Sequence, residues 1–172
     1  MLKTCCFTGH RPKELPWKGD YKDPRCKEFA TTTLLPVIQK YYDNGYRNYI
    51  VGAAVGFDMV ALIALIKFRK EHKIKITIAI PCNNHTAKWS QENRELFAKL
   101  SKLADKIIHT SKFDYYDGCM QRRNEYMVNN SNAVIAYYNG SEGGTANTIK
   151  YAKSKNKKIT VISVTTKKGG DK

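Results

Sequence analysis

The chain has 172 residues, 42% of them hydrophobic and 26% charged, which is typical of one folded domain with a substantial core. Its 30 lysines and arginines exceed its 15 acidic residues, and the net charge of +15 favours anionic partners such as nucleotides or nucleic acid. No apolar run is long enough for a signal or membrane-spanning segment, so we expect a soluble, cytoplasmic protein with no membrane partner.

The cysteines are typical of a reducing compartment. There are five, at irregular spacing and without a C-x-x-C pair, which supports neither a zinc site nor a disulfide framework. We therefore expect no metal ion in this protein.

The first third of the chain predicts a strand, a polar loop and a long helix. Residues 3–8 form a short apolar run that ends at Gly9-His10-Arg11-Pro12. A helix is expected over 24–43, and Pro36 should kink or divide it because proline lacks the N–H that a helix interior needs. Asn44-Gly45 predicts a left-handed end to this helix.

The middle third predicts two strands and two helices. Residues 49–51 form a strand that leads through the glycine-bearing stretch 52–58 into a helix over 59–68. This helix is apolar on nearly all sides, so we expect both of its faces to be covered. Residues 74–80 give the clearest strand of the sequence, and a helix is expected near 89–103.

The last third continues the alternation of strands and helices. Strands are predicted over 106–109, 133–138 and 159–164, and a helix over 118–130. A further helix should follow the glycine turn in 140–148.

This alternation, with several strands fully apolar, predicts a single α/β Rossmann-like domain over 1–164 with a mostly parallel sheet and helices on both faces. The basic tail 165–172 is expected to be disordered. In such folds ligands bind at the carboxyl ends of the strands. Three predicted strand ends carry glycine and polar residues, so we expect one cleft formed by Gly9-His10-Arg11, Gly52 to Asp58, and Gly143-Gly144-Thr145.

The stretch 140–148 joins a buried strand to a helix start and is open to two interpretations. Free N–H groups at the start of the helix can bind a phosphate or another anion, and the two adjacent glycines let a ligand approach the backbone. Alternatively, it is a tight turn in which Thr145 or Ser141 caps the helix.

Two basic segments admit similar alternatives. Arg11 can hold a phosphate and His10 a phosphate or sugar, or they are a surface arginine and a loop-anchoring histidine. Arg122 and Arg123 lie near a helix N-terminus, where positive charge is unfavourable, which suggests a bound anion. The alternative is an acidic partner, for which the candidates are Glu125, Asp117 and Asp114.

Asp58 is either an ordinary acid in the first turn of a helix or an acceptor for the hydroxyl groups of a ribose or the polar groups of a base. The usual dinucleotide fingerprint G-x-G-x-x-G and the Walker lysine motif are both absent, which disfavours an NAD-dependent redox enzyme and an ordinary NTPase. We therefore expect no resident cofactor.

Four motifs occur in order along the chain, namely Phe7-Thr8-Gly9-His10-Arg11-Pro12, Gly52-Ala53-Ala54-Val55-Gly56-Phe57-Asp58, Arg123-Asn124 with Met127, and Gly143-Gly144-Thr145 with Asn147-Thr148 and Tyr151-Ala152. Through these motifs the chain resembles the YpsA-like family of the SLOG superfamily, which includes the DNA-processing protein DprA and the Lonely Guy (LOG) enzymes. The resemblance implies a Rossmann-like fold, a nucleotide or ADP-ribose/NAD-derived small-molecule partner, and a homo-oligomer.

LOG phosphoribohydrolases use an arginine in M-x-x-R-K-x-x-M and a glutamate just after P-G-G-x-G-T. Met120, Arg123 and Met127 match the first segment, but Asn147 and Thr148 occupy the positions of the acids. Neither can act as a carboxylate, so the resemblance favours binding over catalysis. Glu142 or Glu14 could substitute from another position.

The leading hypothesis is a nucleotide-binding protein that senses or sequesters a nucleotide signal, for example as an anti-defence sponge. A LOG-like N-glycosidase and a DprA-like nucleic-acid-binding module are the alternatives. The candidate ligand-binding residues are Thr8, Gly9, His10, Arg11, Gly52, Gly56, Asp58, Arg123, Asn124, Gly143, Gly144, Thr145, Asn147 and Thr148.

Overall fold

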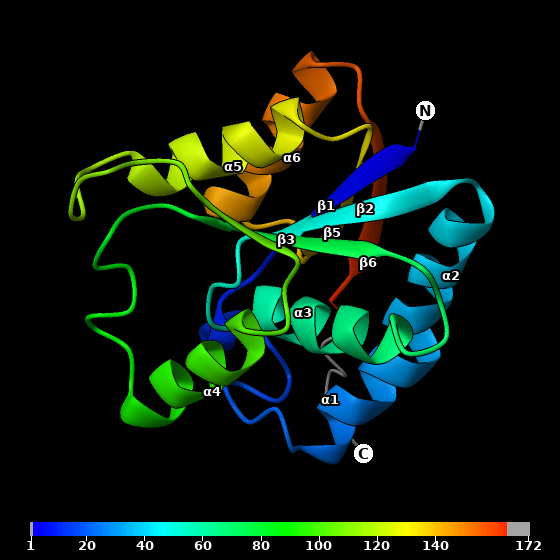
Figure 1. Ribbon diagram of the computed structural model, residues 1–172, viewed down its shortest axis with the longest axis horizontal. Helices are drawn as coiled ribbons and strands as arrows, with labels where there is room; N and C mark the ends of the chain where they lie inside the picture. Colours follow the sequence, from blue (N-terminus) through cyan, green and yellow to red (C-terminus); the bar gives the residue numbers. More distant parts are fainter. Residues whose placement is uncertain (1, 165–172) are drawn as a thin grey trace, which may run out of the picture.

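The computed structural model describes residues 2–164 and contains a six-stranded sheet in the order β4-β3-β2-β1-β5-β6. Every neighbouring pair of strands is parallel, which confirms the predicted α/β fold (Figure 1). The tail predicted over 165–172 lies outside the described residues. The strands are β1 (Lys3–Gly9), β2 (Tyr46–Val51), β3 (Lys75–Ile80), β4 (Lys106–His109), β5 (Ala133–Tyr138) and β6 (Lys158–Ser163).

Helices cover both faces of the sheet (Figure 1). On one face lie α5 (Cys119–Asn129) and α6 (Gly144–Ser154), and on the other lie α1 (Pro24–Phe29), α2 (Leu35–Asp43), α3 (Phe57–Phe68) and α4 (Gln91–Ser101). Adjacent residues of β1 point into different layers, so that Cys5 belongs to the core under α3 and Cys6 to the core under α5 and α6. Within residues 2–164, no helix has both the length and the apolar character needed to cross a membrane.

The predicted helix over 24–43 is divided, as its proline suggested, but the division lies upstream of the proline. A π-helical turn, Ala30–Leu34, separates α1 from α2, and Pro36 lies in the first turn of α2. There the missing N–H removes no hydrogen bond that α2 itself would need, while the wider turn accommodates the proline ring. Gly45 follows α2 with φ of +90°, which confirms the left-handed end of this helix.

Strand β2 begins three residues earlier than its apolar run. Its first residues pair with strands on both sides, Tyr46 with Lys3 of β1 and Asn48 with Lys75 of β3. Backbone pairing therefore extends the strand through the polar residues Arg47 and Asn48, which periodicity alone assigned to a loop.

Helix α3 is covered on nearly all sides, as predicted. Phe57, Met59, Leu62 and Leu65 are buried, and of the apolar residues of α3 only Ile63 is more than a third exposed. The cover comes from the sheet and from the neighbouring helices of the same chain. The apolar character of α3 therefore requires no second copy of the protein.

Helix α4 begins at Gln91 because Ser90 caps it. The Ser90 hydroxyl accepts a hydrogen bond from the backbone N–H of Asn93 at 3.2 Å. We expect Ser90→Ala to lower the free energy of unfolding by about 1 kcal/mol, because an N–H at the start of the helix loses its partner. Chemical denaturation measures this effect. The control is Ser101→Ala at the other end of α4, where a change as large as that of Ser90→Ala would contradict the capping role.

Candidate functional site

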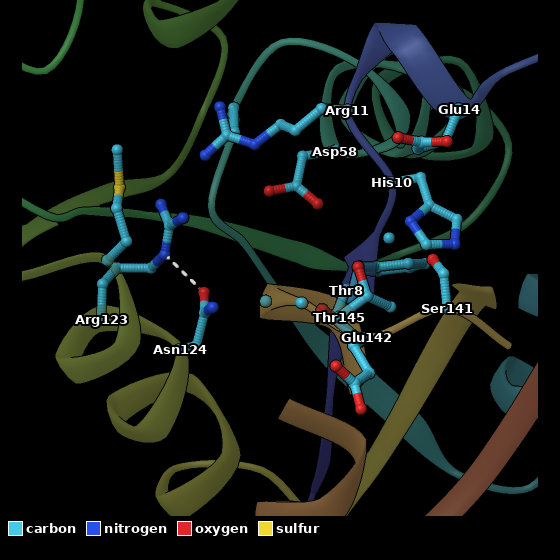
Figure 2. Close-up of a pocket in the computed structure, with 16 residues that line it drawn as sticks. Thr8, His10, Arg11, Glu14, Asp58, Arg123, Asn124, Ser141, Glu142 and Thr145 are labelled. Atoms are coloured by element: carbon cyan, nitrogen blue, oxygen red, sulfur yellow. Dashed lines mark hydrogen bonds between the residues drawn. The ribbon is translucent and has the colours of Figure 1, made fainter. Parts of the chain in front are cut away.

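A cavity of about 340 Å³ lies at the carboxyl ends of β1, β2 and β5 (Figure 2). It is formed by segments from distant parts of the chain, as the convergence of three strand ends predicts. Ten predicted site residues line it, namely Thr8, Gly9, His10, Arg11, Asp58, Arg123, Asn124, Gly143, Gly144 and Thr145.

The other four predicted site residues do not line the cavity. Gly52 lies behind Arg123, and Gly56 donates its backbone N–H to the hydroxyl of Tyr21. Thr148 is buried and donates its hydroxyl to the backbone carbonyl of Gly144 at 2.8 Å, and Asn147 is exposed. Gly52, Gly56 and Thr148 therefore have contacts that support the backbone around the cavity, and the side chain of Asn147 makes no such hydrogen bond among the residues described.

The lining also includes six residues that are not among the fourteen candidate ligand-binding residues, although Glu14 and Glu142 were considered as substitute acids. These are Phe7, Glu14, Ala54, Met120, Ser141 and Glu142. For Glu14 the sequence contained an indication, which is Pro12. This proline starts a short 3-10 turn, Pro12–Glu14, that folds Glu14 back beside the end of β1. Ser141 and Glu142 lie inside the glycine turn itself. Two further carboxylates are thus brought to the cavity.

Three helices begin at this cavity. Its lining includes Asp58, Met120 and Gly144, which lie in the first turns of α3, α5 and α6. Each helix has a glycine as its N-cap, and within residues 2–164 no side chain caps any of the three. The positive ends of three helix dipoles therefore point toward one space, which favours an anion there.

The start of α6 shows which residue caps the helix that follows the glycine turn. Its N-cap is Gly143, with φ of +139°, so capping by Thr145 or Ser141 is wrong. In the described part of the chain, the backbone N–H groups of Gly144 and Thr145 have no acceptor. These donors remain available to a ligand.

Arg123 is buried, with 3% of its surface exposed, and its guanidinium is held on three sides. Its Nη1 donates to the backbone carbonyls of Gly52 at 3.0 Å and Ala79 at 3.3 Å, and its Nε donates to Oδ1 of Asn124 at 2.9 Å. A Cβ on residue 52 would lie 2.7 Å from the guanidinium carbon, so glycine is needed there. Nη2 has no hydrogen-bond partner among residues 2–164, which leaves its two N–H groups for a ligand.

Arg122 and Arg123 differ in position. Arg122 is exposed and does not line the cavity. Three acidic residues were considered as partners, namely Glu125, Asp117 and Asp114. None of them forms an ion pair with Arg123 in the described structure. Burial lowers the pKa of Arg123, and the charge of Asp58 is the largest influence that opposes this shift.

Asp58 is buried and points into the cavity between Arg11 and Arg123 (Figure 2). Burial raises the pKa of its carboxyl, and the positive charges of Arg123 and Arg11 oppose this shift. Neither arginine forms an ion pair with it among the residues described. The carboxyl oxygens can therefore accept hydrogen bonds from the hydroxyl groups of a ligand.

His10 joins the three strand ends. Its Nε2 accepts the backbone N–H of Asn139 at 2.9 Å, and its backbone carbonyl accepts the N–H of Phe57 at 3.0 Å. Its ring also lies 5.6 Å from the ring of Tyr138. Burial lowers the pKa of His10, while the charge of Glu14 opposes that shift.

Metal binding finds no support in the arrangement of side chains. Over residues 2–164, no three His, Cys, Asp or Glu side chains are grouped as ligands for an ion. All five cysteines are free and buried.

Solved structures of DNA processing protein A have the same fold. The protein from Streptococcus pneumoniae superimposes with a TM-score of 0.68 at 16% identity, over 98% of this chain and 53% of the other. A structure that addresses single-stranded DNA binding by the Helicobacter pylori protein superimposes with a TM-score of 0.62 at 16% identity, over 92% and 64%. This chain thus spans less than two thirds of either protein, and the similarity shows the fold.

Other relatives are more similar to this chain in sequence than the DNA processing proteins are. The SPbeta prophage-derived protein YoqJ of Bacillus subtilis (strain 168) is 35% identical over 134 residues, which is 70% of this chain and 78% of YoqJ. A UPF0398 protein of Macrococcus caseolyticus (strain JCSC5402) is 26% identical over 139 residues, 80% of this chain and 74% of that protein. The YspA SLOG family profile matches residues 5–167, which include nearly all of the sheet and every helix of the fold. The chain therefore belongs to the YspA SLOG family.

Proposed function

We propose that the cavity binds a phosphorylated nucleotide or an ADP-ribose/NAD-derived metabolite, and that the protein senses or sequesters such a signal. The observation that carries the proposal is that two sets of free hydrogen-bond donors lie in the lining of one cavity. The uncapped start of α6 lies on one side, and the unpartnered Nη2 of Arg123 lies on the other. Both groups are suited to phosphate oxygens.

The rest of the lining fits a sugar attached to the phosphate. Asp58 offers carboxyl oxygens to hydroxyl groups, and Thr8 and Thr145 add hydroxyl groups of their own. The volume of about 340 Å³ is at the small end of ligand sites, which span about 300–1,000 Å³. A mononucleotide or one half of a larger nucleotide therefore fits this cavity better than an entire dinucleotide.

The first test is a binding measurement with AMP, ADP-ribose and NAD by isothermal titration calorimetry. We expect at least one of them to bind with a dissociation constant in the micromolar range or below, with adenosine as the control. Adenosine should bind much more weakly because it has no phosphate for Arg123 and the start of α6. Equal affinity for adenosine and AMP would contradict a phosphate site.

A second measurement separates binding from hydrolysis. The carboxylates that line the cavity are Asp58, Glu14 and Glu142, while Asn147 and Thr148 are directed elsewhere. A LOG-like N-glycosidase would have to use one of these three acids. Recovery of intact nucleotide after incubation and denaturation supports binding, and release of free base supports the glycosidase.

Nucleic-acid binding is the second candidate, and two observations favour it. The chain has a net charge of +15, and Phe113 and Tyr115 are 72% and 58% exposed in the loop that leads into α5. Exposed aromatic rings next to basic residues can stack on unpaired bases. Affinity for a random single-stranded oligonucleotide that falls steeply with salt, and falls further in Phe113→Ala, would support this candidate.

A further inference from the structure

The segment Asn139–Gly143, called here the 139–143 loop, places the free N–H groups at the start of α6. Within it, the backbone N–H of Ser141 donates to Oδ1 of Asn139 at 2.9 Å, and Gly140 and Gly143 have positive φ angles. The described hydrogen bond that joins this loop to β1 runs from the N–H of Asn139 to Nε2 of His10. The position of the loop therefore depends on that bond.

The bond also fixes the tautomer of His10. A backbone N–H can only donate, so Nε2 carries no hydrogen and the neutral ring carries its hydrogen on Nδ1. Figure 2 shows the other ring nitrogen, Nδ1, on the side of the ring that faces Asp58. His10 thus presents an N–H donor to the cavity while its other nitrogen holds the loop.

We infer that His10 is a positioning residue for the proposed nucleotide site, which holds the 139–143 loop in its binding geometry only while its ring is neutral. This inference rests on the proposed function. Protonation puts a hydrogen on Nε2, which then faces the N–H of Asn139 and can no longer accept it. The 139–143 loop, which leads into the start of α6, then loses this hydrogen bond, while α6 itself stays packed against β1.

The sign of the pH effect follows from the surroundings of the ring. Burial lowers the pKa of His10 from its ordinary value of 6.5, so the folded protein favours the neutral ring. The stabilisation is complete above the ordinary pKa and is lost as the pH falls through the lowered one. Tyr138 lies beside the ring and the charge of Glu14 acts on it, while Arg11, Asp58 and Glu142 are the other charged groups that line the same cavity.

His10→Gln is the decisive variant, because its side-chain oxygen can accept the Asn139 N–H and does not titrate. We expect the amide NMR signals of Asn139, Gly143 and Gly144 in the ligand-free protein to shift together with the His10 ring between about pH 7.5 and pH 5. In His10→Gln these amides should stay constant. Loop amides that do not change while the His10 ring titrates would overturn the inference, whatever the ligand.

Binding of ADP-ribose supplies the functional readout, since its diphosphate keeps its charge over this range. The wild-type affinity should fall about threefold or more between about pH 7.5 and pH 5, and that of His10→Gln should change less. Glu14 and Asp58 are present in both proteins, so the difference between the two pH profiles isolates His10. Equal pH profiles would contradict the inference. No binding of AMP, ADP-ribose or NAD at any pH would count against the proposed function, and the amide titration would still decide the role of His10.

His10→Phe separates loop attachment from packing. Phenylalanine can keep the contact with the ring of Tyr138 but cannot accept the Asn139 N–H. We expect the amide NMR signals of its loop to differ from the wild-type positions at every pH, while the melting temperature stays near that of wild type. Wild-type amide positions in His10→Phe would overturn the inference.

Discussion

Arg123→Ala is expected to weaken binding of the nucleotide by about tenfold to a hundredfold, because a hydrogen bond from a charged donor contributes about 1.5–3 kcal/mol. The variant removes Nη2, the donor left free by the contacts of Arg123 with Gly52, Ala79 and Asn124. Calorimetric titration with whichever of AMP, ADP-ribose and NAD binds the wild type measures the loss.

The matched control is Arg122→Ala. Arg122 is adjacent in the sequence and carries the same charge, but it is exposed and lies outside the cavity. Its replacement should change the affinity less than about threefold at moderate salt, since only screened long-range attraction is lost. Equal losses in the two variants would mean that net charge, and not the guanidinium of Arg123, determines binding. Circular dichroism must show that Arg123→Ala is folded at the temperature of the titration.

Gly9→Ala is expected to give the largest loss of stability among the changes considered, about 1–3 kcal/mol or more. A Cβ at this position would lie 2.2 Å from Cδ1 of Phe57 and 2.7 Å from its Cβ. Phe57 is fully buried at the start of α3, so its ring cannot move away without displacing neighbouring core residues. Chemical denaturation measures the change in the free energy of unfolding.

Gly19→Ala is the control for this substitution. The nearest atom to a Cβ at residue 19 is Cβ of Pro12 at 3.7 Å, which is an ordinary contact. We expect its stability to stay within about 0.5 kcal/mol of wild type. A Gly9→Ala protein as stable as Gly19→Ala would show that α3 can shift away from β1.

The sheet could be predicted from the sequence because its strands are apolar runs between clear turns. The runs at 106–109 and 133–138 became β4 and β5 without change. Tyr46 and Asn48 were missed, because their place in β2 depends on pairing with Lys3 and Lys75, which no local pattern contains.

The site could be predicted in outline for a similar reason. Gly9-His10-Arg11 and Gly143-Gly144-Thr145 follow strands, and parallel topology brings such ends together. Asn147 and Thr148 were placed by analogy with a motif, but neither lines the cavity, because Asn147 is exposed and the Thr148 hydroxyl donates to the backbone carbonyl of Gly144. Glu14 was not placed, because its position depends on the turn that starts at Pro12.

The central place of β1 has a consequence for synthesis of the protein. This strand comes first among the six strands of the sheet, yet it pairs with β5, and the Asn139–His10 bond links residues 129 positions apart. A nascent chain that ends before β5 has an unpaired edge on β1, and it also lacks the backbone N–H groups at the start of α6. The proposed ligand site is therefore complete only after α6 has been synthesised, and under this proposal a bound nucleotide stabilises only molecules that have reached that stage, by mass action.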